Sequence, residues 1–198
     1  NGLKEVSRSE KTYITDEQHD YELAATRDAF SAHKQVTADA PINETITLTR
    51  AVAQLNIFTT DYEQVEESFR PAYTGLTITT AADFNVLTGT SFGSATSDLR
   101  SYVAVKTEKE GAAPDKNKVF TGYYFTSSEG KNVVDMDVHF YRADNSEVVT
   151  YNMTNIPLQQ NYRTNVTGAL LTQTGTLHVE TEAAFAGDDI ETTEPKDT

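Results

Sequence analysis

The chain has 198 residues, 37% of them hydrophobic, and a formal net charge of -14, with 30 Asp and Glu against 16 Lys and Arg. This length suffices for one large core or two small ones. The excess of carboxylates opposes binding to nucleic acid and to anionic lipid, both of which need clustered basic side chains. Because the chain has no cysteine, disulfides, thiolate metal sites and a cysteine nucleophile are excluded.

The aromatic composition points to β structure. There are 10 Tyr and 9 Phe but no Trp, and Thr is abundant, a mixture that favours pleated, half-buried surfaces. No apolar run approaches the roughly 20 residues that span a bilayer. We therefore expect a soluble, mainly antiparallel β protein, and because the chain begins at Asn1 we expect a processed or trimmed product.

The clearest strand follows a polar, irregular stretch over residues 1–45. Residues 45–59 read TITLTRAVAQLNIFT, in which Ile46 and Leu48 share one parity while Leu55 and Ile57 share the other. A β-bulge near Arg50 would bring both sets to one face, since one inserted residue shifts the alternation. We expect both apolar sets to lie in the core.

A short helix is predicted next. Asp61 is a good N-cap, acids follow it, and Tyr62, Val65 and Phe69 form one stripe before Pro71.

The remainder of the chain repeats a β pattern. Apolar and polar residues alternate over 134–140, and the turn sequence at 143–146 leads into a hairpin partner over 147–153. Further strands are predicted at residues 76–80, 84–87, 99–105, 119–126, 162–171 and 176–181. The Gly and Ser-rich stretch 89–97 is the best internal boundary. We predict an amino-terminal β domain over 1–95, incomplete as it stands, a carboxy-terminal β-sandwich over 96–187 and an acidic disordered tail over 188–198.

Catalytic and metal-binding patterns are weak. Asp135 and Asp137 lie two apart on one strand face, where they could hold Ca²⁺, but alternation alone places solvated acids this way. The four His residues (His19, His33, His139 and His178) share no metal-ligand spacing, and no nucleophile elbow or phosphate loop is present. We predict no enzymatic activity, cofactor or metal site. Seven tyrosines could stack on sugars, although most are expected to pack across strands: Tyr73, Tyr102, Tyr123, Tyr124, Tyr141, Tyr151 and Tyr162.

Two segments resemble the fimbrillin-type cell-surface fimbrial proteins of Bacteroidetes. The first combines Thr-Arg-Asp-Ala-Phe at 26–30 with Ile-Asn-Glu-Thr at 42–45 and Leu-Thr-Arg-Ala-Val-Ala-Gln-Leu-Asn-Ile at 48–57. The second, more specific, is Ile-Pro-Leu-Gln-Gln-Asn-Tyr-Arg-Thr-Asn-Val at 156–166, followed by Gly168 and Leu-Leu-Thr at 170–172. The similarity extends over about residues 20–187, with a looser middle.

The resemblance implies transthyretin-like β-sandwich domains, export as a lipoprotein to the outer membrane, and roles as stalk, anchor or tip subunits. Members of the family usually have about a hundred residues of β structure before the first segment, and these are not in this chain. Polymerising members fill a gap in one subunit with a strand from its neighbour.

The leading hypothesis is thus a non-enzymatic fimbrial subunit or accessory adhesin that assembles with other subunits by strand exchange at sheet edges. The candidate exchange segment contains Leu177, Val179 and Phe185. The alternative is a monomeric surface module that binds a glycan or a host protein. A third, minor hypothesis is a β-sandwich accessory domain of a hydrolase.

Overall fold

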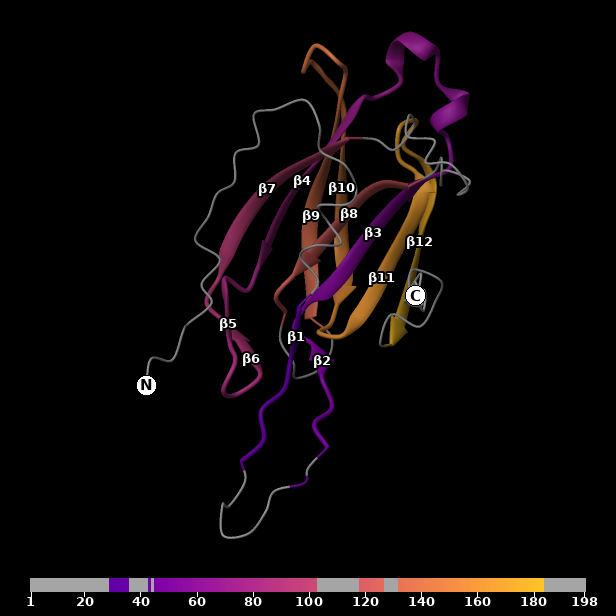
Figure 1. The fold of residues 1–198 in the computed structure, drawn as a ribbon. Helices are drawn as coiled ribbons and strands as arrows, with labels where there is room; N and C mark the ends of the chain where they lie inside the picture. Colours follow the sequence, from indigo (N-terminus) through magenta and orange to yellow (C-terminus); the bar gives the residue numbers. More distant parts are fainter. Residues whose placement is uncertain (1–28, 36–42, 44, 103–117, 127–131, 184–198) are drawn as a thin grey trace, which may run out of the picture.

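The protein is built mainly from two four-stranded sheets (Figure 1). The computed structural model describes residues 29–35, 43, 45–102, 118–126 and 132–183. One sheet has the order β10-β9-β4-β7 and the other β12-β11-β3-β8. The strands are β3 (Ala53–Thr59), β4 (Tyr73–Thr80), β7 (Ala95–Tyr102), β8 (Lys118–Tyr124), β9 (Asn132–Tyr141), β10 (Glu147–Leu158), β11 (Tyr162–Ala169) and β12 (Thr174–Ala183).

Two small antiparallel pairs accompany these sheets. They are β1 (Phe30–Ser31) with β2 (Thr49–Arg50), and β5 (Asp83–Asn85) with β6 (Thr90–Phe92). Pairing among the large strands is antiparallel except between β3 and β11, which run parallel. The prediction of a mainly β, antiparallel sandwich is confirmed.

One hydrophobic core lies between the two sheets. Alternation places Met136, Val138 and Phe140 of β9 inside, each at most 2% exposed, whereas Asp135 and Asp137 face outward. The same cluster takes residues from strands of both sheets: Leu55, Ile57, Leu76, Ile78, Phe120, Tyr124, Met153, Ile156, Leu158 and Val166. Burial of these side chains drives the two sheets together.

The predicted boundary between residues 95 and 96 falls at the first residues of β7. That strand pairs with β4 along residues 95–102, and each four-stranded sheet combines strands from both sides of the boundary. Within the described residues the boundary therefore does not separate two cores. The predicted tail over 188–198 lies outside the described residues.

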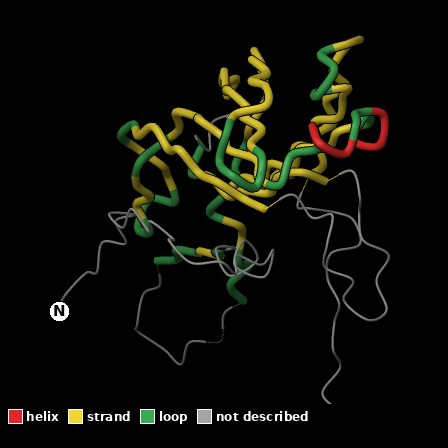
Figure 2. The backbone as a smooth tube through the Cα atoms, turned by 90° about the horizontal axis from the view of Figure 1, so that it is seen from above, coloured by secondary structure: helices red, strands yellow, loops and turns green. Residues whose placement is uncertain are grey.

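The predicted short helix is replaced by two 3-10 turns, Tyr62–Gln64 and Glu67–Phe69. Figure 2 shows them in red at the margin of the strand region. Two features prevent a continuous α-helix: Val65 and Glu66 are extended, and Asp61 makes no side-chain cap bond. The carboxylate of Asp61 instead binds the distant turn at Leu171 and Thr172, so this residue does not cap a helix as predicted.

The expectation that Ile46 and Leu48 join the core is wrong. Their side chains are 57% and 60% exposed. A bend at Ala51 and Val52 does interrupt the strand, but it directs residues 45–50 away from the sandwich, where β2 pairs with β1. Figure 1 shows this two-stranded arm extending beyond the sheets.

Candidate strand-exchange site at the β12 edge

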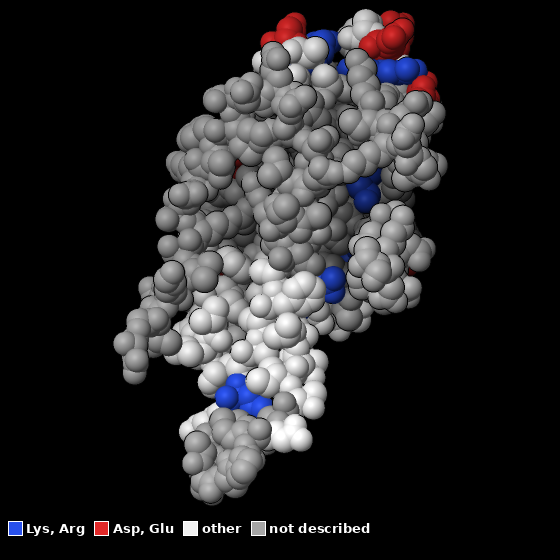
Figure 3. All heavy atoms as spheres, viewed as in Figure 1, with Lys and Arg blue, Asp and Glu red and all other residues white. Residues whose placement is uncertain are grey.

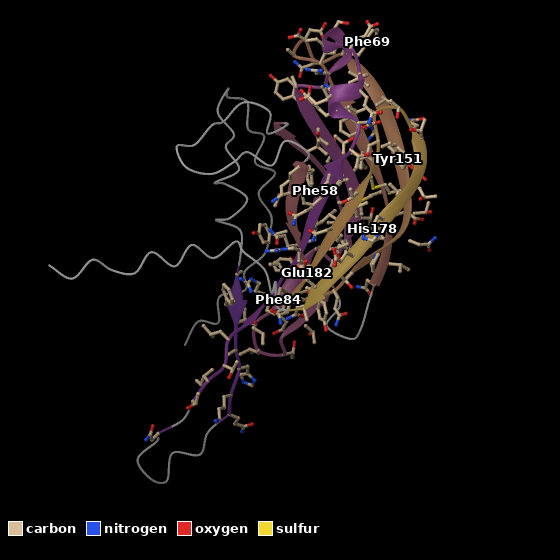
Figure 4. The ribbon with its side chains drawn as sticks, turned by 90° about the vertical axis from the view of Figure 1, so that its right-hand side faces the viewer. Phe58, Phe69, Phe84, Tyr151, His178 and Glu182 are labelled. Atoms are coloured by element: carbon tan, nitrogen blue, oxygen red, sulfur yellow. The ribbon has the colours of Figure 1, made fainter. Side chains whose placement is uncertain are left out.

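Strand β12 ends the sheet order β12-β11-β3-β8, and its partner in the sheet is β11. Leu177 and Val179 point toward the core, half-buried, while His178 and Glu180 are exposed on the outer face. Figure 4 shows His178 and Glu182 along this strand. Of the three predicted exchange residues, the structure thus brings Leu177 and Val179 together on one face; Phe185 lies outside the described residues.

A glycine in β11 makes room for β12. A Cβ atom added to Gly168 would lie 2.8 Å from Cδ2 of Leu177, and the register of the two strands shifts between Thr167 and Ala169. The missing side chain lets Leu177 reach the core. Because Leu177 and Val179 are only half-buried, each contributes about 1 kcal/mol, less than a fully buried aliphatic residue.

The turn before β12 is fastened to the body of the protein by Asp61. The backbone N–H groups of Leu171 and Thr172 donate to the Asp61 carboxylate over 3.1 and 2.7 Å, and the Thr172 hydroxyl donates over 2.7 Å. Thr59 donates a further hydrogen bond to this buried group. Burial raises the pKa of Asp61, but these hydrogen bonds outweigh it and hold the pKa below the ordinary value of 3.8.

The far end of β12 is attached through a row of polar side chains on the outer face of the sheet. Glu182 lies 3.5 Å from the guanidinium of Arg163 in β11. Arg163 also donates to the side-chain amide oxygen of Gln54 in β3 over 2.8 Å, and the side-chain amide N–H of Gln54 donates to the Tyr123 hydroxyl of β8 over 3.1 Å. The row therefore crosses all four strands.

The two segments that carry the family resemblance meet in this sheet. Residues 53–59 form β3 and residues 162–169 form β11, in parallel register with Gln54 opposite Arg163 and Asn56 opposite Asn165. Asn56 donates to Asn165 over 2.9 Å and accepts from Thr121 over 2.9 Å. The polar residues of both motifs thus cross-link neighbouring strands.

The outer face of the other sheet has a shallow polar hollow of about 180 Å³. Its lining comes from β4, β9 and β10: Thr77, Ile78, Thr79, Asp135, Met136, Asp137 and Asn152. Asn152 donates to Asp137 over 2.8 Å, and the backbone N–H of Asn155 donates to Asp135 over 2.9 Å. No group of three carboxylate or imidazole side chains suited to a metal ion occurs among the described residues.

His139 adjoins this hollow through Thr77, and Tyr141 lies further along the same strand, β9. The ring of Tyr141 lies over Gly75, where an added Cβ would be 3.0 Å from Cε2 of the ring. His139 contacts the Thr150 hydroxyl at 2.8 Å and the Thr77 hydroxyl at 3.3 Å.

Tyr124 is fully buried and Tyr123 nearly so, as packing residues would be. Of the other histidines, His33 is exposed in the arm and His19 lies outside the described residues.

Sequence reasoning missed Asp61 and the Gln54–Arg163 pair as elements that hold the β12 edge. Asp61 has the sequence appearance of a helix cap, and its partners are more than a hundred residues away. Gln54 did carry a signal, because a polar residue between Ala53 and Leu55 in an apolar strand needs a partner. That signal does not identify the partner strand.

Fold and site together define a two-sheet β-sandwich protein in which, among the described residues, β12 is a half-buried edge strand. The chain belongs to a family of unknown function (DUF6562), whose model matches residues 1–196. No curated protein matches the chain. Among the described residues, no helix is long and apolar enough to cross a membrane.

Several solved structures of Bacteroides proteins resemble the chain at low identity. A Bacteroides uniformis protein with a provisional role in cell adhesion is 11% identical, with a TM-score of 0.42, and the match covers 70% of this chain and 52% of that one. A Bacteroides ovatus protein with the same provisional role is 15% identical (TM-score 0.42; 73% and 49% covered). A fimbrial protein from Bacteroides vulgatus is 11% identical (TM-score 0.29; 70% and 56% covered). The chain spans about half the length of each of these proteins.

Proposed function

We propose that this protein is a non-enzymatic subunit or accessory adhesin of a bacterial cell-surface fimbria, exported as a transthyretin-like outer-membrane lipoprotein. It assembles with other fimbrial subunits by exchange of strand β12. The observation that carries the mechanism is the state of β12: an edge strand whose two core-facing residues are half-buried.

An edge strand of this kind is suited to exchange. Its backbone groups on one side are paired with β11, and the same groups of β11 would pair equally well with an identical β12 from another molecule. Exchange therefore preserves the β11–β12 hydrogen bonds and the contacts of Leu177 and Val179. The free-energy difference between the exchanged and the unexchanged form is small as a result, and the conformation of the turn at 170–173 sets it.

The absence of cysteine from the whole chain permits a clean test by disulfide trapping. Thr167 of β11 lies opposite His178 of β12. A Thr167→Cys sample mixed with a His178→Cys sample, under mild oxidation, is expected to give covalent dimers on a non-reducing gel. Dimers above the background from random collision report β12 of one molecule lying on β11 of another. Thr167→Cys/His178→Cys in one chain reports the unexchanged form as a cross-linked monomer.

Thr79→Cys, an exposed position on the other sheet, replaces Thr167→Cys in the control mixture and sets the background from random collision. Exchange is rejected if the double variant closes within single chains while the two single variants never exceed that background. Light scattering on the unmodified chain at several concentrations would then show a monomer.

The second candidate function is a monomeric module that binds a glycan or a host protein, and the polar hollow on the outer face of β4, β9 and β10 favours it. The carboxylates, the amide and the hydroxyls that line this hollow are groups that recognise sugar hydroxyls. In that case Asp137→Ala is expected to weaken binding to an immobilised polysaccharide panel about tenfold, whereas Asp98→Ala on the neighbouring strand is the matched control. If the unmodified chain bound none of the polysaccharides, the hypothesis of glycan binding would be rejected.

A further inference from the structure

Within the described residues, the two large sheets have four edge strands: β10 and β7 in one sheet, β12 and β8 in the other. An edge strand offers backbone groups to other chains, and proteins usually interrupt such strands with bulges, Pro or Lys. β10 has two register shifts and contains Pro157. The register of β8 with β3 shifts between Ile57 and Phe58, and β8 begins at Lys118. Both strands are therefore poor templates for a further strand.

β7 lacks these interruptions. All 8 of its residues pair with β4 in an unbroken antiparallel register, from Tyr73–Tyr102 to Thr80–Ala95. Its sequence, ATSDLRSY, contains no Pro, Gly or Lys. Figure 1 shows β7 at the margin of the sandwich opposite to β12. A strand this regular, at the edge of the described sheet, is suited to pairing with a strand from another chain.

The charges of β7 indicate which strand fits. The strand has one acid, Asp98, and one base, Arg100, on either side of Leu99. When two copies of β7 run antiparallel with Leu99 opposite Leu99, Asp98 of each copy is opposite Arg100 of the other. Opposite charges at directly opposed positions stabilise an antiparallel pair of strands. The sequence of β7 is therefore complementary in charge to itself.

The same two charges disfavour other registers. A shift of two residues brings Asp98 opposite Asp98 or Arg100 opposite Arg100, and like charges directly opposite each other destabilise the pair. A shift of one residue would bring the core parity of one copy to the outer face of the other. The β4 residues paired with these positions, Thr77 and Gly75, are uncharged, and Figure 3 shows the visible acidic side chains mainly at the end with the 3-10 turns. The strand's own charges thus determine the register.

We propose that β7 of one molecule pairs antiparallel with β7 of a second copy, so that the two sheets of order β10-β9-β4-β7 become one continuous sheet. A two-fold axis passes between the two Leu99 residues, so the contact is isologous and closes a dimer. One pair of strands is a small interface, so dimerisation is weak and is measured at protein concentrations above those used for spectroscopy and light scattering. The contact does not involve β12, and it holds or fails independently of strand exchange.

Charge reversal within β7 tests this contact. Sedimentation equilibrium at high protein concentration is expected to show a monomer–dimer equilibrium for the unmodified chain. Asp98→Arg and Arg100→Asp should each weaken the dimer about tenfold or more, because like charges then face each other twice. An equimolar mixture of the two variants should dimerise as strongly as the unmodified chain, since every acid again faces a base. The double variant Asp98→Arg/Arg100→Asp should recover the dimer for the same reason.

Two controls separate this contact from other effects. Glu180→Arg makes the same change of charge at an exposed position of β12, and it should dimerise like the unmodified chain. The oxidised Thr167→Cys/His178→Cys chain, in which β12 cannot leave its own β11, should do so as well. Circular dichroism checks the folding of each variant, and Asp98→Arg, at an exposed position, decides the question if Arg100→Asp does not fold.

A strict monomer at all concentrations overturns the proposal and leaves the β7 edge to a strand of another protein. So does an Asp98→Arg chain that associates as strongly as Glu180→Arg, or a mixture of the two charge variants that stays as weak as either alone. Association that disappears in the oxidised Thr167→Cys/His178→Cys chain would assign the dimer to exchange of β12 and likewise overturn it.

Discussion

Replacing Asp61 by asparagine is expected to lower the free energy of unfolding by about 2–4 kcal/mol at neutral pH. The carboxylate accepts hydrogen bonds from Thr59, Leu171 and Thr172 in a buried position. An amide of the same shape turns one acceptor into a donor, which faces N–H and O–H groups and leaves some of them without a partner. Urea denaturation followed by circular dichroism measures the change.

The same variant should change how stability depends on pH. The folded pKa of Asp61 is below its ordinary value of 3.8, so its contribution is complete above about pH 3.8 and is lost as the pH falls through the folded pKa. The difference between the unmodified chain and Asp61→Asn should therefore shrink as the pH is lowered below 3.8. Asp98→Asn, an exposed position on β7, should reproduce the unmodified chain throughout. Equal stability of Asp61→Asn and the unmodified chain at pH 7 would contradict the assigned role.

Gly122→Ala is expected to destabilise the fold by about 2–3 kcal/mol. Gly122 of β8 lies opposite Leu55 of β3. A Cβ added to Gly122 would be 2.8 Å from the Tyr124 ring and 2.9 Å from the Phe120 ring. Both rings are at most 1% exposed, so neither can move aside without disturbing the core. Thermal and urea denaturation both report this loss.

Gly75→Ala provides the matched control, because it too adds a Cβ in a strand, 3.0 Å from the ring of Tyr141. That ring is half-buried on the outer face and has solvent to move into. The loss there should stay below about 1 kcal/mol. Similar losses of stability at both glycines would show that a general cost of alanine at strand positions, rather than crowding in the core, determines the loss at Gly122.

The strands were predictable wherever one face is buried and the other solvated. Alternation over 134–140 gives β9 directly, and Asp144, Asn145 and Ser146 supply the turn into β10: Ser146 donates its backbone N–H to Asp144, and Asn145 has a φ of 67°. These features depend on neighbours in sequence, which a single sequence displays.

The failures share a different cause, which is that distant partners determine the outcome. Ile46 and Leu48 have the pattern of a buried strand, but the bend at Ala51 removes them from the core. Asp61 has the pattern of a helix cap, but Thr172 and Leu171 claim its carboxylate.

The parallel pairing of β3 with β11 also has a consequence for how the chain acquires its structure. Gln54 and Arg163, which face each other there, are 109 residues apart in sequence. Closing so long a loop precedes any gain from the contacts it brings. The central ladder of the sheet therefore waits for the last third of the chain to emerge during synthesis, and folding should be slow, with the apolar β3 exposed in the interval. A holding chaperone that masks residues 53–59 during this delay would protect the chain from aggregation.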